Sequence, residues 1–156
     1  MGSDRALRIR TIRLLFVLSQ RLRNVLDRVL ADSGLTAQQA AVLTAVRSRG
    51  APSFKEVAEA IGTSHQNVKQ LAVALERKGF LTISPDPHDR RARRLQATAK
   101  NHRYWAARDP RDHDELLELF ADLNRAEAKA LFELLDRVYG RVLQAEAEPE
   151  RPSTHR

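Results

Sequence analysis

The stretch FKEVAEAIGTSHQNVKQLAVALERKGFL, from Phe54 to Leu81, decides the fold. Its apolar residues recur every three to four positions, which is the spacing of a helix that buries one face. Ser53 and Glu56 form a capping box that begins a short helix ending at Ile61. After the turn GTS, a longer helix runs from Ser64 to Lys78. The stretch therefore predicts two consecutive helices joined by a three-residue turn.

A change of period follows these helices. FLTISP, from Phe80 to Pro85, alternates as a strand does, and RLQAT, from Arg94 to Thr98, is suited to be its return partner. The segment DPHDRRAR between them is strongly basic. We expect a β-hairpin with a basic tip.

The rest of the chain is expected to be helical, because the whole sequence of 156 residues contains only 6 glycines and 6 prolines and its apolar residues recur every three to four positions. A first helix is expected from about Ala6 to Ala31, ending at Gly34, and a second opens with the capping box of Thr36 and Gln39 and ends at Gly50. The first helix carries one apolar stripe: Ile12, Leu15, Leu18, Leu22, Leu26 and Val29.

Two helices are expected after the hairpin. Thr98 can cap the first of them, and Asp109-Pro110 resembles an N-cap followed by a first-turn proline, so we expect a kink or a new start there. Asn124 and Glu127 form a capping box for the last helix. Its apolar stripe comprises Leu131, Leu135, Val138 and Val142.

Composition narrows the class of protein. A chain of 156 residues is about one domain, and it has no cysteine, which excludes disulfides, thiolate metal sites and sensing by cysteine oxidation. No apolar run approaches the roughly 18 residues that span a bilayer. The arginine-rich start lacks the uninterrupted apolar stretch of a signal peptide, so we expect a cytoplasmic protein without a membrane partner.

The net charge of +7 is unevenly distributed. Residues 1–31 and 85–108 each hold seven basic and two acidic residues, whereas residues 109–150 hold five basic and twelve acidic residues. This asymmetry suggests a polyanionic partner for the basic segments, and both a nucleic acid and a membrane surface fit it.

The two central helices have the order and size of a helix-turn-helix, whose second helix enters the DNA major groove. With Val68, Leu71, Ala72 and Leu75 facing inward, the outward side chains near its start are Ser64, His65, Gln66, Asn67, Lys69 and Gln70. Asn and Gln can bond adenine edges, and Ser, His and Lys can reach bases or phosphates.

Each of these residues also has a local interpretation. Ser64, or Thr63 with Gln66, is needed as a helix cap, and Lys69 and Gln70 fit an ordinary solvent-facing surface. However, no carboxylate lies between residues 62 and 75, although a surface that meets only water usually mixes both signs. This bias favours a phosphate-facing surface.

Three segments together resemble the MarR family of winged-helix transcriptional regulators: LTAQQAAVL (Leu35 to Leu43), the opening stretch (Phe54 to Leu81) and DPHDRRARRLQAT (Asp86 to Thr98). The similarity covers roughly residues 7 to 143. It implies a homodimer formed by the first and last helices, which places two recognition helices in successive major grooves of double-stranded DNA.

The resemblance also implies roles for single residues. The six outward residues from Ser64 to Gln70 would contact DNA, Arg90, Arg91 and Arg93 would reach a minor groove or its phosphates, and Asp89 would orient an arginine by an ion pair. Members commonly repress genes and release DNA when a small-molecule effector binds between the dimerisation helices and the DNA-binding lobe. Asn101, where glycine is common, and the Asp109-Pro110 break depart from the pattern, so no effector-binding residue is carried over.

The prediction is a mainly α protein with a small β-hairpin wing, a winged helix-turn-helix plus a helical dimerisation region. Its segments are a dimerisation helix (1–34), the DNA-binding lobe (35–98), dimerisation helices (99–147) and a disordered tail (148–156). The protein is expected to be a sequence-specific DNA-binding regulator of transcription, and repression is favoured over activation. The alternative is a winged-helix adaptor that binds proteins through the acidic segment 109–150.

Other chemistry is not predicted. The five histidines include no pair at i, i+4 on one helix, so surface histidines are favoured over a zinc site, and no cofactor is expected. There is no glycine-rich phosphate loop and no G-x-S-x-G elbow, which argues against an enzyme. Tyr104 and Trp105 fit either an effector pocket or, more commonly, packing.

Overall fold

The computed structural model describes residues 2–87, 89 and 92–147, and for residues 2, 108–113 and 115 it describes the backbone only. The predicted wing contacts Arg90 and Arg91, together with His88 and the tail at 148–156, lie outside the described residues. The chain divides into two compact units, Met1–Asp112 and His113–Arg156. The segmentation into lobe and dimerisation regions stays a prediction.

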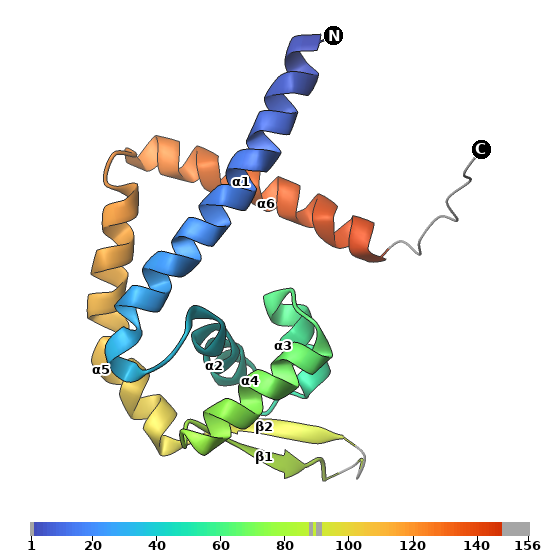
Figure 1. Cartoon of the computed structure of the whole chain (residues 1–156), viewed down its shortest axis with the longest axis vertical. Coiled ribbons are helices and arrows are strands. Elements are labelled where there is room, and N and C mark those ends of the chain that lie inside the picture. The colour runs from blue at the N-terminus through green and yellow to red at the C-terminus, as the bar shows by residue number, and fades with distance from the viewer. Residues whose placement is uncertain (1, 88, 90–91, 148–156) are drawn as a thin grey trace, which may run out of the picture. The chain divides into compact units, whose positions relative to one another are not determined.

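The first unit holds most of the elements (Figure 1). They are α1 (Gly2–Val29), a 3-10 turn (Ala31–Ser33), α2 (Ala37–Arg49), α3 (Phe54–Ile61), α4 (His65–Arg77), β1 (Leu81–Pro85), β2 (Arg93–Ala97) and the larger part of α5 (Ala99–Leu117). The second unit holds the end of α5, a 3-10 turn (Glu118–Phe120) and α6 (Arg125–Ala147).

Local capping explains why the helices begin where they do. The side chains of Thr36 and Ser53 each accept a hydrogen bond from the backbone N–H of the third helical residue. The side chains of those residues, Gln39 and Glu56, accept one from the backbone N–H of Thr36 and Ser53. Both predicted capping boxes are therefore confirmed. The predicted box of Asn124 at the start of α6 is also present. These caps satisfy backbone N–H groups that a helix start otherwise leaves unpaired.

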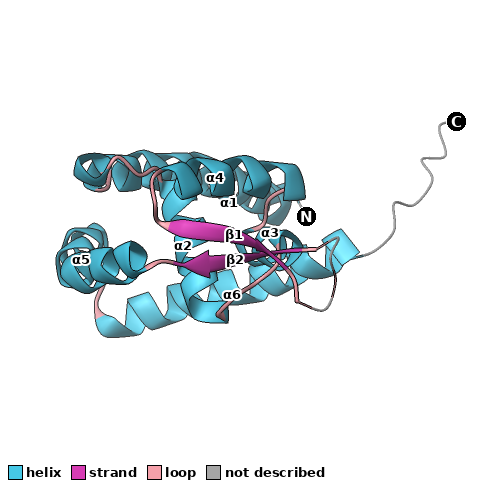
Figure 2. Cartoon of the chain, turned by 90° about the horizontal axis from the view of Figure 1, so that it is seen from below, coloured by secondary structure: helices cyan, strands magenta, loops and turns pink. Residues whose placement is uncertain are grey.

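The core lies where α2, α3 and α4 pack on one another and on the hairpin. The predicted inward residues Val68, Ala72 and Leu75 of α4 are buried, and Leu71 is partly buried. The strands β1 and β2 are antiparallel and lie side by side, with Leu81 opposite Ala97 and Pro85 opposite Arg93 (Figure 2). The winged helix-turn-helix architecture is therefore confirmed.

Two expectations about element bounds need correction. Both strands start one residue from their predicted positions, so Arg93 belongs to β2 and not to the turn. Of the kink or new start predicted at Asp109-Pro110, the new start is wrong, because α5 continues through this position as one helix of 19 residues. The kink stays a prediction. Proline removes one backbone donor and therefore one intrahelical hydrogen bond, but it does not end α5.

Large apolar side chains remain exposed on both units. On α1 they include Leu14 (63% exposed) and Phe16 (73%), and on α6 they include Phe132 (69%) and Tyr139 (55%). Exposed apolar surface of this extent is uncommon on a monomer and marks an interaction site. Across the described ranges, no helix is both long enough and apolar enough to cross a membrane.

Candidate DNA interface

The exposed face of α4 carries the predicted contact residues. Ser64, His65, Gln66, Lys69 and Gln70 are exposed, and Asn67 is half-buried. Two of these side chains are engaged locally. The Ser64 hydroxyl accepts a hydrogen bond from the Asn67 backbone (3.1 Å), and the Asn67 amide donates to the Thr63 hydroxyl (2.9 Å). Ser64 is therefore the helix cap, and Asn67 is tied to the turn.

A groove separates α4 from the wing. Its walls come from the start of α3, the exposed side of α4 and both strands: Ser53, Phe54, Lys55, His65, Lys69, Val73, Ile83, Ala92 and Arg93. Three of these residues are cationic and none is a carboxylate. The His65 ring packs edge-on against Phe54, with the ring centroids 5.6 Å apart, which fixes the imidazole at the groove wall. The groove suits a negatively charged backbone.

Lys55 was not predicted from the sequence. It lies in the first turn of α3, beside the groove, and forms an exposed ion pair with Glu59 (3.8 Å). The available signal was its position, because the first helix of a helix-turn-helix crosses the DNA backbone. An exposed pair of this kind is weak, so Lys55 can exchange Glu59 for a phosphate.

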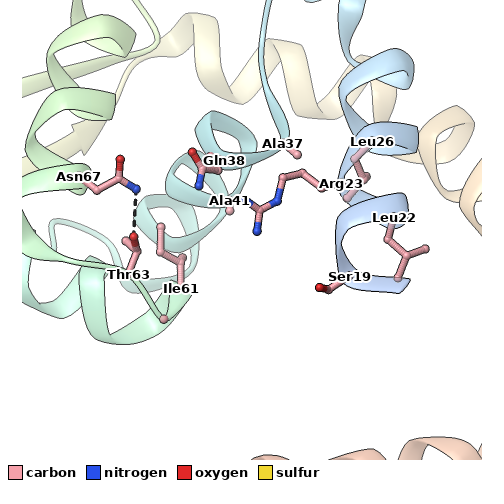
Figure 3. Close-up of a pocket in the computed structure, with 11 residues that line it drawn as sticks. Ser19, Leu22, Arg23, Leu26, Ala37, Gln38, Ala41, Ile61, Thr63 and Asn67 are labelled. Atoms are coloured by element: carbon pink, nitrogen blue, oxygen red, sulfur yellow. Dashed lines mark hydrogen bonds between the residues drawn. The ribbon is translucent and has the colours of Figure 1, made fainter. Parts of the chain in front are cut away.

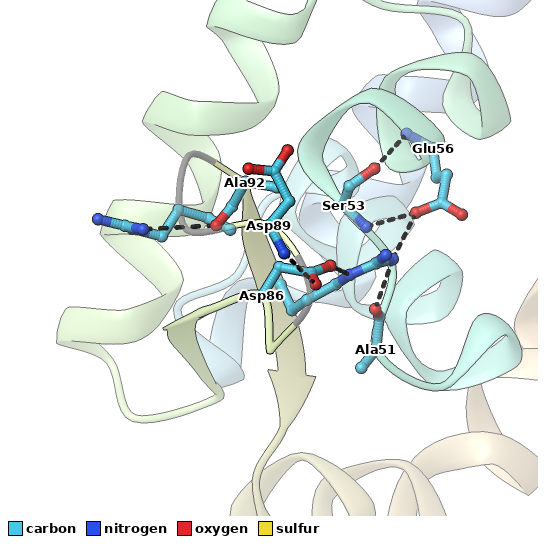
Figure 4. A network of polar contacts seen from close by, with 8 residues as sticks. Ala51, Ser53, Glu56, Asp86, Asp89 and Ala92 are labelled. Carbon is cyan, nitrogen blue, oxygen red and sulfur yellow. Dashed lines mark hydrogen bonds and ion pairs between the residues drawn. The ribbon is translucent and has the colours of Figure 1, made fainter.

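A polar network joins the base of the wing to the start of α3 (Figure 4). The Arg94 guanidinium donates from Nε to the Asp86 carboxylate, and from Nη1 to Glu56 Oε2 (3.0 Å) and to the Ala51 carbonyl (3.3 Å). The hydrogen bond to Asp86 raises the pKa of Arg94. Hydrogen bonds from Ser53, with a contribution from the charge of Arg94, lower the pKa of Glu56.

Asp86 is the acidic residue that organises the described part of the wing. Asp86 is 5% exposed, and its Oδ1 accepts a hydrogen bond from the Asp89 backbone N–H (3.1 Å). Sequence reasoning chose Asp89 as the wing's ion-pair partner and overlooked Asp86. The side-chain role of Asp89 stays a prediction, since the neighbouring Arg90 and Arg91 lie outside the described residues.

The start of α5 joins the lobe through aromatic packing. Tyr104 contacts both Phe80 and Trp105 edge-on, with ring centroids 5.5 Å and 5.2 Å away, and Arg47 of α2 lies over the Trp105 ring at 5.1 Å. The packing interpretation of Tyr104 and Trp105 is therefore confirmed. Asn101, one turn earlier, is fully buried, and its amide atoms have no hydrogen-bond partner among the described residues.

A pocket of about 490 Å³ lies behind the helix-turn-helix (Figure 3). α1 supplies Ser19, Leu22, Arg23 and Leu26, α2 supplies Ala37, Gln38 and Ala41, and the turn with α4 supplies Ile61, Gly62, Thr63 and Asn67. Figure 3 shows the Arg23 side chain extending from α1 toward Gln38 and Ala41 of α2, with Thr63 and Asn67 on the opposite side of the pocket. The lining combines an apolar floor with hydrogen-bond donors and contains no carboxylate.

Within the ranges that the structure describes, no three histidine, aspartate or glutamate side chains gather closely enough to hold a metal ion.

The fold and this interface define a winged helix-turn-helix protein, and comparison with known proteins agrees. A family model described as "MarR family" matches residues 33–92. The transcriptional repressor MprA of Escherichia coli is 29% identical over 93 residues, which are 60% of this chain and 53% of MprA. The chain thus spans about half the length of the curated relatives it matches.

Two solved structures are similar over most of the chain. BpsR of Bordetella bronchiseptica, whose DNA binding is regulated by 6-hydroxynicotinic acid, is 29% identical with a TM-score of 0.76, covering 83% of this chain and 98% of BpsR. PcaV of Streptomyces coelicolor, solved with its natural ligand, is 25% identical with a TM-score of 0.69, covering 79% and 89%. The chain is therefore similar to MarR family regulators in sequence over residues 33–92 and in fold over most of its length.

Proposed function

We propose that this protein is a homodimeric repressor that binds a pseudo-palindromic DNA site, with residues 64–78 in the major groove and the wing, residues 86–93, at the minor groove. The observation that carries the proposal is the groove between α4 and the hairpin, which is cationic and free of carboxylates. Phosphates favour such a surface, whereas a surface that meets only water mixes both signs.

The side chains divide by role in this proposal. His65, Gln66 and Gln70 are exposed along the start of α4 and read base edges. Lys55, Lys69 and Arg93 line the groove and contact phosphates. Arg90 and Arg91, which lie outside the described residues, have the same role in this proposal. Ser64 and Asn67 position the helix through their local hydrogen bonds.

Binding to the DNA upstream of the protein's own gene, measured across a salt series, tests the proposal. Several phosphate contacts predict an affinity loss on the order of 10³-fold between 50 and 200 mM salt. Replacing Arg90 and Arg91 with alanine should weaken binding to all sequences, while Gln70→Ala should change the base preference at one position. A flat salt response, or gel filtration in which the protein ignores every duplex, would instead favour a protein-binding adaptor.

We further propose that the pocket behind the helix-turn-helix takes a small apolar anion that releases DNA. Its volume of about 490 Å³ lies in the range of small-molecule sites, and Arg23, Gln38, Ser19 and Thr63 offer hydrogen-bond donors above an apolar floor. Asn67 of α4 belongs to the same lining, so a ligand there touches the helix that reads DNA.

Small aromatic carboxylates, 6-hydroxynicotinate among them, are suitable probes. We expect at least one of them to weaken DNA binding by the wild-type protein and to lose this effect in Arg23→Gln, which keeps its affinity for DNA. Equal release of both proteins from DNA would place the anion elsewhere.

A further inference from the structure

We propose that Arg94 is a positioning residue that fixes the wing to the first helix of the helix-turn-helix, so that wing and recognition helix meet DNA as one body. The inference rests on the proposed DNA-binding function. It assigns different roles to two neighbouring arginines of β2: Arg93 contacts DNA, and Arg94 makes contacts within the protein.

The wing needs such an attachment, because an isolated two-stranded hairpin is marginally stable. Each of its strands has five residues. On the side of α3, the Leu95 backbone donates to the Pro52 carbonyl (2.9 Å), and Ser53 and Arg94 form an isolated bridge. The hairpin is thus joined to the loop that precedes α3 by its backbone as well as by the Arg94 side chain.

Burial makes the charged part of this attachment strong. The Asp86 side chain is 4% exposed, and the Arg94 side chain 34% exposed, where they meet. A buried carboxylate is costly unless it is paired and hydrogen-bonded, so removing the Arg94 guanidinium takes a charged partner away from Asp86 at the base of the wing. The same guanidinium bonds Glu56 and Ala51, which tie it to the start of α3 and the loop before it.

The alternation of the strand explains why adjacent arginines differ. Successive side chains of a strand point to opposite faces. Arg93 is exposed and lines the groove beside α4, whereas Arg94 is half-buried among Asp86, Glu56 and Ala51. Glu56 also caps α3 by accepting a hydrogen bond from the Ser53 backbone (2.7 Å), so one carboxylate belongs to both the helix start and the wing base.

Comparing Arg94→Gln with Arg93→Gln tests the assignment. The two variants carry the same substitution at neighbouring positions of one strand, so they differ only in which arginine is lost. In salt-series binding to duplex DNA, Arg93→Gln should reduce the salt slope by about one phosphate contact per protomer, which is about two for the dimer. Arg94→Gln should lower affinity at least tenfold with the slope unchanged. If Arg94→Gln lowers the slope by the same amount as Arg93→Gln, the proposal is overturned, since Arg94 would then contact a phosphate itself.

Amide hydrogen exchange of the free protein gives a readout that does not depend on DNA. Arg94→Gln should speed exchange of the Asp86 and Leu95 amides, which donate to Ala92 and Pro52, relative to the wild type. Asp86→Asn, which keeps the size of the side chain, should do the same and serves if Arg94→Gln does not fold. Unchanged exchange in both variants overturns the proposal, whereas failure of the wild type to bind any duplex overturns only the proposed function.

Discussion

At the scale of single residues, Asn101 stands out because its buried amide has no hydrogen-bond partner in the described part of the chain. An unsatisfied buried polar group costs about 1–3 kcal/mol. Leucine has the same branched arrangement of heavy atoms and no polar atom, so Asn101→Leu should raise the free energy of unfolding by about 1 kcal/mol. Urea denaturation followed by far-UV circular dichroism measures this change.

The same substitution elsewhere provides a control of opposite sign. Asn124 caps α6 through hydrogen bonds to the backbone of Ala126 (2.9 Å) and Glu127 (3.1 Å), so Asn124→Leu should lose about 1 kcal/mol of stability. If Asn101→Leu is destabilising as well, the Asn101 amide has a bonded partner in solution, such as an internal water.

Glu56 makes stability depend on pH. Its pKa in the folded protein is lowered by hydrogen bonds from Ser53 and by the charge of Arg94. A lowered folded pKa means that the stabilisation is fully present above the ordinary value of 4.5 and is lost as pH falls through the folded pKa. As the pH is lowered below 4.5, we expect the urea midpoint of Glu56→Gln to decrease less steeply than that of the wild type. Parallel curves for the two proteins would contradict this contribution.

At the scale of elements, the turn between α3 and α4 depends on Gly62. Its φ of 63° lies in the left-handed region, and a Cβ there would meet no atom within 4 Å, so the cost of a side chain is conformational and not steric contact with neighbours. We expect Gly62→Ala to cost about 1 kcal/mol and Gly62→Asn less, because asparagine tolerates this conformation. Thermal unfolding of both variants checks the order, and an equal loss would point to another cause.

Sequence reasoning succeeded where the determining interactions are local. The capping residues Thr36, Ser53 and Asn124 act over three positions, and the period of α4 named its buried side correctly. The Arg94 network could not be predicted from the sequence, because Glu56 is 38 positions away from Arg94. In addition, Asp89 and not Asp86 was predicted to be the ion-pair partner in the wing. Pro110 led to the opposite kind of error. As a local signal it predicted a new helix start, but the residues on both sides of it form one helix.

At the scale of the whole molecule, the exposed apolar faces of α1 and α6 predict assembly with a second copy. Phe132 is 69% exposed on α6, and a charge there should prevent burial against a partner. We expect sedimentation of Phe132→Glu to show a monomer at micromolar concentration, with much weaker binding to a two-half-site duplex. Glu133→Ala, a change at the next position that leaves Phe132 in place, should remain dimeric. A dimeric Phe132→Glu would exclude this part of α6 from the interface.

Trp105 is the one tryptophan of the sequence, and it lies where α5 meets the lobe, with the Arg47 guanidinium over its ring. Its fluorescence is therefore a built-in optical signal from a single known place, without any attached dye. Duplex DNA contributes no tryptophan emission, so a change in intensity or wavelength when DNA or a ligand is added reports on the packing of α5 against α2. Stopped-flow measurement of that signal can time the response of this joint relative to binding.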